Sequence, residues 1–449
     1  MILQERVKLL LFVLLSISLN SFSTNTKFYN ISDTYGITSG EAFSICKDQY
    51  GFIWTSTKTG ILRVTEDDCR NYELPCRTTD FVFVKLTYSN SQLFSYTNNG
   101  QIFHYDEPTD QFFFLTDLRE ETDNSHITIG TIVADTSNVL WIASSIGLFK
   151  YENNILTKIP QTEEDIKHLT FYDDNHLFYI TSAGISLLNI STSESRLLYS
   201  NTTEDFFQVP SLYYDDQLKR LWIGTGSAGL FYYDIIRKSL SDIPIRNFPK
   251  QPILAIRKDA KNTLLIGIDG QGIWNISEKG DTILHIYKED LNNPFSLRGD
   301  GVYDILCDGS KNWIATFTGK LSFFENNNSQ ITPVTYQINN PNSLGNNYVN
   351  QIIEDHEGHI WFATNNGVSR WDAASNKWKH YYQNKSEQAK VFLSLCEDNQ
   401  GHIWAGSYSS GIYLLDRETG KTLKHYSSKT NTPGFTGDFF FFLFFFFEG

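Results

Sequence analysis

The sequence has little of several things that mark common protein classes. Methionine occurs once and cysteine five times in 449 residues, and no Cys-x-x-Cys or mixed Cys/His metal spacing is present. Between residue 24 and about residue 438, no stretch approaches the ~18 apolar residues that a membrane helix needs. Heptads, long amphipathic segments of period 3.6 and a strand–helix alternation are absent too. These absences exclude a helical bundle, an alternating α/β fold and a bundle of membrane spans.

Positive charge is also scarce, with 37 Lys and Arg against 51 Asp and Glu, so the formal net charge is −14. An acidic surface argues against non-specific binding of nucleic acid, which depends on Lys and Arg contacts to phosphate. Aromatic residues are plentiful at 15%, and 29 glycines accompany many Asn, Ser and Thr residues. This composition favours strands joined by tight turns.

The N-terminus has the features of a secretory signal peptide. Arg6 and Lys8 precede an apolar run of 11 residues, Leu9 to Leu19, and Ser21-Phe22-Ser23 offers a small-x-small cleavage pattern. We predict a signal peptide over residues 1–23 and a mature chain outside the cytoplasm, in the periplasm. The alternative is an uncleaved membrane anchor, for which the run is short.

A repeat covers residues 40 to 425. Comparable copies include DQYGFIWTSTKTGIL (48–62), DTSNVLWIASSIGLF (135–149) and DNQGHIWAGSYSSGI (398–412), each with a large apolar residue at one anchor position. The nine anchors are Trp54, Phe94, Trp141, Phe178, Trp222, Leu265, Trp313, Trp361 and Trp404. A fixed period of this kind indicates a repeat architecture.

Each copy carries the turn residues of antiparallel hairpins. An Asp six residues before the anchor, which bonds its own backbone, predicts a tight turn; these residues are Asp48, Asp135, Asp216, Asp259, Asp355 and Asp398. A Gly six or seven residues after the anchor predicts a second turn; these residues are Gly60, Gly100, Gly147, Gly184, Gly229, Gly272, Gly319, Gly367 and Gly411.

Four short antiparallel strands per ~40–45 residues predict an all-β fold, a β-propeller of four-stranded blades. A β-sandwich would not repeat so strictly, and a β-solenoid coil is usually shorter. The periodic Asp residues would also suit calcium, but no Asp-x-Asp-x-Asp-Gly loop exists, so their role in turns accounts for them.

The repeat resembles that of the two-component-regulator propeller family. The opening FYNISDTYGITSGEAFSICKDQYGFIW and the connectors YKEDLNNPFSLRGDGVYDI (287–305) and YQINNPNSLGNNYVNQI (336–352) are similar to those of the family. The resemblance implies the extracytoplasmic sensor region of a hybrid two-component system, with two seven-bladed propellers, a membrane helix and a cytoplasmic histidine kinase.

We therefore expect a seven-bladed propeller over residues 24–335, closed by a strand near residue 28, and the first blades of a second propeller over 336–438. A single ring of eight or nine blades is the competing arrangement. Residues 439–449 depart from the pattern, because Phe439 to Phe447 reads FFFFLFFFF. We interpret this end as a truncation, a frameshift or a non-natural terminus, so that the kinase and the only membrane helix would be missing.

No catalytic set, cofactor motif or metal site is predicted. The ten His residues are scattered; His359 and His402 occupy equivalent places in the repeat, which indicates a structural role. Cys46, Cys307 and Cys396 also share one repeat place and are expected in the core. Cys69 and Cys76 would pair in an oxidising compartment if their geometry allowed it.

Propellers place function on one rim, in the loops between second and third strands and in the connectors between blades. These loops are rich in Asn, Ser, Thr and Gly with a few aromatics, which suits an oligosaccharide but equally suits plain turns. The candidate ligand-binding residues are Lys58, Asp269, Gln271, Arg298, Asn346, Asn347, Asn365, Asn366 and Tyr408.

Three functions remain open. The first is a glycan sensor that signals by a ligand-induced population shift to a kinase, with a homodimer formed through the complete ectodomain. The second is a secreted scaffold that binds proteins. The third is a propeller lyase, since the repeat also resembles that of streptogramin lyases. Such a lyase needs a His base on the rim, and none lies in the rim loops.

Overall fold

The computed structural model describes residues 26–31, 41–65, 68–160, 162, 164–201, 206, 208–326, 333–383, 390–430 and 437–441. The predicted signal peptide and the last eight residues lie outside these ranges. The regular secondary structure of the described chain consists of strands and one short helix, α3 (Leu118–Thr122). Of the helices in this part of the chain, none is both long and apolar enough to cross a membrane.

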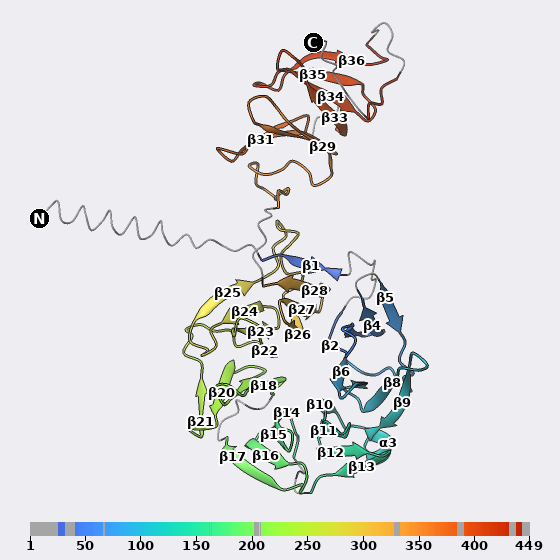
Figure 1. Ribbon diagram of the computed structural model, residues 1–449, viewed down its shortest axis with the longest axis vertical. Helices are drawn as coiled ribbons and strands as arrows, with labels where there is room; N and C mark the ends of the chain where they lie inside the picture. Colours follow the sequence, from blue (N-terminus) through green and yellow to red (C-terminus); the bar gives the residue numbers. More distant parts are fainter. Residues whose placement is uncertain are drawn as a thin grey trace, which may run out of the picture. The chain divides into compact units, whose positions relative to one another are not determined.

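The strands form nine four-stranded antiparallel sheets, which confirms the predicted all-β propeller of four-stranded blades (Figure 1). The first three blades are β2 (Ser44–Lys47), β3 (Ile53–Thr57), β4 (Gly60–Val64), β5 (Cys69–Tyr72); β6 (Val84–Ser89), β7 (Gln92–Thr97), β8 (Gln101–Asp106), β9 (Gln111–Asp117); and β10 (Ile129–Ala134), β11 (Leu140–Ser144), β12 (Gly147–Glu152), β13 (Ile155–Lys158).

Blades 4 to 6 repeat the order. They are β14 (His168–Asp173), β15 (His176–Thr181), β16 (Gly184–Asn189), β17 (Ser195–Ser200); β18 (Ser211–Asp215), β19 (Arg220–Gly224), β20 (Leu230–Asp234), β21 (Ser239–Asp242); and β22 (Ile253–Lys258), β23 (Leu264–Ile268), β24 (Gly272–Ile276), β25 (Ile283–Tyr287).

Blade 7 is completed by the start of the chain. Strands β26 (Val302–Asp308), β27 (Lys311–Thr316) and β28 (Lys320–Glu325) are joined by β1 (Phe28–Asn30), which pairs antiparallel to β28. The inner strand β26 also lies against β2 of blade 1, so the ring closes after seven blades. The alternative of one ring with eight or nine blades is therefore wrong.

Two further blades form a second compact unit. They are β29 (Val349–Glu354), β30 (Ile360–Thr364), β31 (Gly367–Asp372), β32 (Lys377–Tyr381); and β33 (Phe392–Glu397), β34 (Ile403–Ser407), β35 (Ile412–Leu415), β36 (Thr422–Tyr426). Unit 1 holds residues up to 290 and 295–329, and unit 2 holds 291–294 and those from 330 onward.

The core lies between neighbouring blades. The anchor Trp141 of blade 3 is 2% exposed and packs with Leu169 and Leu177 of blade 4. Similar clusters occur between other pairs of blades; for example, Trp361 of blade 8 packs with Phe392 and Leu395 of blade 9. A blade cannot bury its apolar face alone, so burial depends on stacking against the next repeat.

The repeated Asp does more than form the turn that the sequence predicts. In blade 3, Oδ1 of Asp135 accepts the amides of Ser137 and Val139 at 2.8 and 3.0 Å, and Oδ2 accepts the indole Nε1 of Trp141 at 3.1 Å. The same indole–carboxylate bond occurs at the other anchors with this geometry: Asp48–Trp54, Asp355–Trp361 and Asp398–Trp404. One carboxylate thus ties the turn to the anchor.

Blade 5 departs from this rule. Asp215, not Asp216, accepts the turn amides of Gln217 and Leu218, while Asp216 bonds Lys219. The indole Nε1 of Trp222 is buried and makes no hydrogen bond within the described residues. The interpretation of Asp216 as the turn residue is wrong, because this turn takes its carboxylate from one residue earlier.

We expect Asp135→Ala to lower the free energy of unfolding by about 2 kcal/mol, because it removes charge-assisted bonds and leaves a buried indole N–H without a partner. Asp216→Ala is the matched control; its side chain is 76% exposed and pairs only with Lys219, so its loss should change the free energy of unfolding far less. Urea denaturation of both variants checks this. Equal losses would contradict a special role for the carboxylate beneath the anchor.

The five thiols are all unpaired, including Cys69 and Cys76. Cys46 and Cys396 lie opposite their anchors, Trp54 and Trp404. Cys307 lies opposite Asn312 instead, because the β26–β27 hairpin turns earlier, directly after Asp308. The prediction that Cys307 shares the repeat place of Cys46 and Cys396 is therefore wrong. Burial raises the pKa of Cys307 to about 12 and that of Cys396 to about 11.

The described start of the Phe-rich end makes repeat contacts. The amide of Phe440 donates to Ser407 O at 3.1 Å, and Ser394 Oγ donates to Phe440 O at 3.1 Å. Ile253 makes the equivalent pair of bonds with Thr225 and Ser211 at the start of β22. Residue 440 thus takes the place where an inner strand begins.

Candidate functional site

The turns between second and third strands lie on the same rim as the connectors, as expected from the usual strand order of a blade. In unit 1, the amide of Asp269 bonds Pro252 O at 2.9 Å, and the amide of Phe317 bonds Gly301 O at 2.9 Å. Asn98 and Ser145 bond the segments that lead into their own blades in the same way. This rim is the candidate site of unit 1.

Three of the sequence-predicted residues lie on neighbouring parts of this rim, in blade 6 and the connector to blade 7. Gln271 Oε1 accepts from Lys288 Nζ at 2.9 Å, and the carboxylate of Asp269 lies beside Gly301. Arg298 lies in the connector, where its carbonyl accepts from Thr316 Oγ1 at 2.8 Å. The side chain of Asp300 fixes the connector by accepting the amide of Glu289 at 2.8 Å.

Arg298 borders a cleft of about 320 Å³ that Asn30, Glu289, Thr318 and Lys320 also line. Asn30 belongs to β1, so the closing strand contributes to the rim. The side-chain Nδ2 of Asn30 donates to Gly319 O at 3.0 Å. The cleft therefore exists only in the closed ring.

Lys58 is separated from this group in the chain and in its contacts. It lies at the exposed tip of the β3–β4 turn in blade 1. Its ammonium makes no hydrogen bond or ion pair with any residue that the structure describes. Lys58 is accessible to a ligand but is not positioned by neighbouring side chains.

An aromatic group at the mouth of the central channel was not among the predicted residues. Phe317 is 45% exposed and stacks on Tyr303, with ring centroids 5.9 Å apart. Tyr303 meets Phe43 edge to face at 5.4 Å. Burial and the nearby carboxylates of Asp269 and Glu41 raise the pKa of the Tyr303 phenol. The Phe317-Thr318 turn was visible in the sequence, but its partner Tyr303 lies in an inner strand.

In unit 2, the predicted Asn residues hold the backbone of turns and connectors. Asn346 Oδ1 accepts the amide of Tyr348 at 2.8 Å, and Asn347 Oδ1 accepts the amide of Tyr336 at 2.7 Å. Asn365 Oδ1 accepts from Asn350 Nδ2 at 3.0 Å. These bonds favour the turn interpretation of these side chains.

The other two predicted residues of unit 2 lie in turns between second and third strands. The amide of Asn366 bonds Thr364 Oγ1 at 3.1 Å. Tyr408 is 57% exposed, and its ring meets that of Phe439 edge to face at 5.5 Å. Its exposed ring makes Tyr408 the strongest ligand-contact candidate of this unit, beside Tyr348 at 72% exposure.

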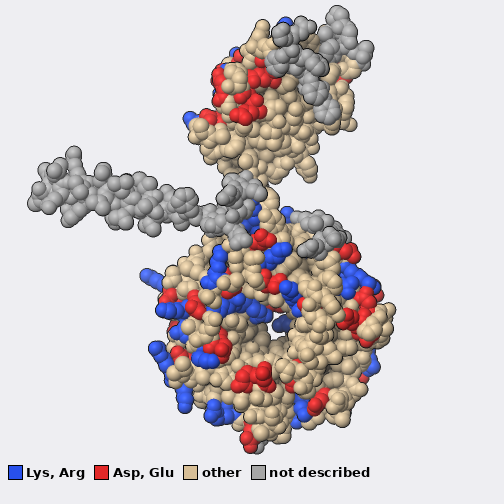
Figure 2. Space-filling view, in the orientation of Figure 1, with Lys and Arg blue, Asp and Glu red and all other residues tan. Residues whose placement is uncertain are grey.

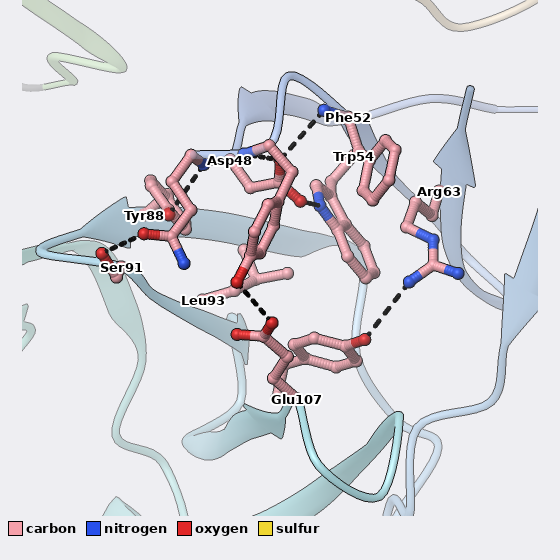
Figure 3. A pocket seen from close by; sticks show the side chains of 11 residues that line it. Asp48, Phe52, Trp54, Arg63, Tyr88, Ser91, Leu93 and Glu107 are labelled. Carbon is pink, nitrogen blue, oxygen red and sulfur yellow. Dashed lines mark hydrogen bonds between the residues drawn. The ribbon is translucent and has the colours of Figure 1, made fainter. Parts of the chain in front are cut away.

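A second hollow, of about 260 Å³, lies between blades 1 and 2 near the turns that join first and second strands (Figure 3). Tyr105, Phe52 and Leu93 contribute to its walls, and Tyr50 donates to Glu107 across its entrance at 2.6 Å. In blades 8 and 9, an ion pair of Glu357 and Arg417 takes the place of Tyr50 and Glu107. The positions that flank the hollow are therefore joined by a polar contact in both pairs of blades.

The described side chains contain no group of three or more His, Cys, Asp or Glu residues placed to hold a metal ion. The two repeated histidines lie beside their turn carboxylates, His359 by Asp355 and His402 by Asp398, at 3.2 and 3.3 Å. These contacts account for their periodicity. His359 also contacts the guanidinium of Arg370, which packs over Trp361.

Comparison with known families agrees with the resemblance seen in the sequence. Residues 343–366 and 386–409 match the model of the family described as two component regulator propeller. Two segments of the chain, which begin blades 8 and 9, thus match the repeat of the family that the sequence resembles. Among proteins of curated function, none matches the chain.

Solved structures share the fold. The extracellular domain of BT3049 from B. thetaiotaomicron, assigned to a hybrid two component system, is 19% identical with a TM-score of 0.55; the match covers 90% of this chain and 55% of that one. The extracellular domain of BT4673 from the same organism is 19% identical with a TM-score of 0.53, over 92% and 62%. The chain thus spans little more than half the length of these domains.

Virginiamycin B lyase from Staphylococcus aureus also has this fold, at 13% identity and a TM-score of 0.52, over 67% of this chain and 99% of that one. At such identities the likeness concerns the propeller architecture.

Proposed function

We propose that the chain is the extracytoplasmic ligand-sensing region of a two-component sensor and that it binds an oligosaccharide at the rim of unit 1. The observation that carries this proposal is the exposed ring of Phe317, stacked on Tyr303 beside the carboxylate of Asp269. A pyranose presents an apolar face that can lie on an aromatic ring, and its hydroxyls donate to carboxylates and amides. Gln271 and Arg298 supply further polar groups on the same rim.

The matched family repeats and the predicted signal peptide support the extracytoplasmic location and the sensor role. Signalling would follow from preferential binding to one arrangement of the ectodomain, since a ligand with equal affinity for both arrangements shifts nothing. The kinase that the resemblance implies would read this shift. We expect no catalytic turnover from the chain itself.

Thermal unfolding of the full chain with a panel of plant, host and microbial oligosaccharides tests the proposal. A ligand present at a hundred times its Kd should stabilise the protein by about 2.7 kcal/mol and raise Tm. Phe317→Ala should weaken binding about tenfold, because the stacking face is lost. Phe113→Ala is the matched control, since that ring is 47% exposed on the outer strand β9.

Two results would count against the proposal. One is the absence of any response to the panel; a protein partner recovered with the purified chain would then favour the scaffold alternative. The other is equal loss of binding in the Phe317 and Phe113 variants, which would place the ligand elsewhere. Turnover of a ligand would favour the lyase alternative.

A further inference from the structure

The central channel of unit 1 concentrates positive charge in a chain that is acidic overall. Inner strands of all seven blades line a cavity of about 360 Å³. Its charged lining consists of Lys85 on β6, Arg257 on β22 and Asp304 on β26, with His168 on β14. Two basic side chains thus face one carboxylate in a chain whose net charge is −14. Figure 2 shows Lys and Arg surface inside the central opening.

The single carboxylate, that of Asp304, already makes contacts that help to close the ring. Asp304 Oδ2 accepts the amide of Ile45 in blade 1 at 2.9 Å, and its Oδ1 pairs with Arg257 at 3.1 Å. It also accepts from Ser44 Oγ at 3.3 Å. Asp304 therefore neutralises Arg257 and links blade 7 to blade 1, and it is not hydrogen-bonded to Lys85.

Lys85 has no partner of opposite charge among the described residues. Its ammonium lies 5.1 Å from the ring centroid of Phe83, and it makes no ion pair or hydrogen bond there. Burial and the charge of Arg257 lower its pKa, although Asp304 acts in the opposite direction. A buried lysine that makes no ion pair or hydrogen bond of its own carries a desolvation cost of a kind that is frequent at functional sites.

His168 completes the group. Its Nδ1 contacts Leu169 O at 2.9 Å, so we assign the ring proton to Nδ1, which leaves Nε2 as an acceptor. Burial, then Lys85, then Arg257 lower the pKa of this imidazole to about 3, so the ring is neutral. Tyr96, Tyr213 and Tyr303 also line the cavity, and each has a raised pKa, so they stay neutral too.

We propose that the channel of unit 1 binds an anionic group, a carboxylate or a sulfate, with the ammonium of Lys85 as its principal partner and Arg257 beside it, while the neutral ring of His168 forms part of the wall. The aromatic mouth and the channel are continuous, because Tyr303 and Phe43 line the cavity and Tyr303 stacks on Phe317. The inference rests on the proposed function and deepens it: the ligand class is an acidic oligosaccharide with one ring on Phe317 and one anionic group in the channel.

Two matched pairs of probes test the charge preference on the full chain. A short oligogalacturonate is compared with its methyl ester, and a sulfated dextran oligosaccharide with plain dextran of the same length. We expect the acidic member of one pair to bind at least about tenfold more tightly, with an affinity that falls as salt rises. The pair that responds identifies the anion as carboxylate or sulfate.

Lys85→Met should remove this preference, and Lys85→Arg should keep it. The Tm of unliganded Lys85→Met should be unchanged or raised, because a buried ammonium without a hydrogen-bonding partner is replaced by an apolar side chain. Lys261→Met is the matched control, since Lys261 is an exposed lysine in the β22–β23 turn. Equal binding of acidic and neutral probes overturns the inference. So does an unchanged preference in Lys85→Met, or an equal loss in Lys261→Met.

A titration with inorganic sulfate, followed by the imidazole resonances of His168, separates the two proposals. His168→Gln assigns the resonances. One outcome is that sulfate shifts the His168 resonances in the parent protein but not in Lys85→Met, while no oligosaccharide binds. This outcome would support the channel site and refute the glycan sensor. Neutral oligosaccharides that bind through Phe317, together with resonances that do not move, would refute only the channel site.

Discussion

Gly184→Ala is expected to lower the free energy of unfolding by about 4 kcal/mol or more. This is the largest effect that we predict for adding a single methyl group. Gly184 begins β16 with φ +149°, and an added Cβ would overlap the carbonyl oxygen of Tyr199 on β17. The clash is with backbone, so a side-chain rotation cannot relieve it. The fourth strand of blade 4 would have to move.

Gly270→Ala provides the control for backbone conformation alone. Gly270 also has positive φ, +66°, but an added Cβ would meet nothing within 4 Å. Its replacement should cost about 1 kcal/mol. Urea unfolding of both variants measures the difference. Similar values for the two would show that the close approach of the fourth strand contributes little.

Phe28→Ala is expected to destabilise unit 1 by about 3 kcal/mol or more, because it removes a buried ring from the strand that closes the propeller. Phe28 is 4% exposed and packs against Phe324 and Tyr287, with ring centroids 5.0 and 5.5 Å away. These contacts join β1 to Phe324 of blade 7 and to Tyr287 of blade 6. Their loss favours the open ring, in which β28 becomes an edge strand.

Tyr29→Ala is the adjacent control. Tyr29 is 41% exposed and stacks on Phe323 at 5.2 Å, so about 1 kcal/mol is expected for its removal. Hydrogen exchange should show faster exchange at the amides of β1 and β28 in Phe28→Ala than in Tyr29→Ala. Unchanged exchange at both strands would contradict the closing role of β1.

Local sequence accounts for the blade. The anchors, the turn Asp residues and the Gly that opens each third strand predict where hairpins form, because each acts on its own few neighbours. The prediction failed at Asp216, since sequence spacing cannot tell which of two adjacent carboxylates enters a turn. The prediction also assigned Cys307 to the same repeat place as Cys46. It failed there because the repeat pattern does not give the length of each hairpin.

The candidate site was predicted only in part. Asp269, Gln271 and Arg298 lie in loops that the sequence marks, and the structure places them on one stretch of rim. Tyr303 was missed because it stands in an inner strand, where the sequence shows only alternation. The Asn residues of unit 2 were selected because their amide groups can bind a sugar. The same amide groups bond the backbone of turns, and composition alone cannot distinguish these two roles.

By itself, the sequence determined the repeat, the four strands of each blade and the turns between them, since these depend on residues close together in the chain. The sequence also predicted seven blades with a closing strand near residue 28, but only the tertiary structure decided between this ring and one of eight or nine blades. The structure also places the side chain of Lys85 in a channel with Arg257 and His168, whereas the sequence shows Lys85 only as a polar residue in an alternating strand. Residues more than 80 positions apart meet there because the ring closes, and no local pattern records that closure.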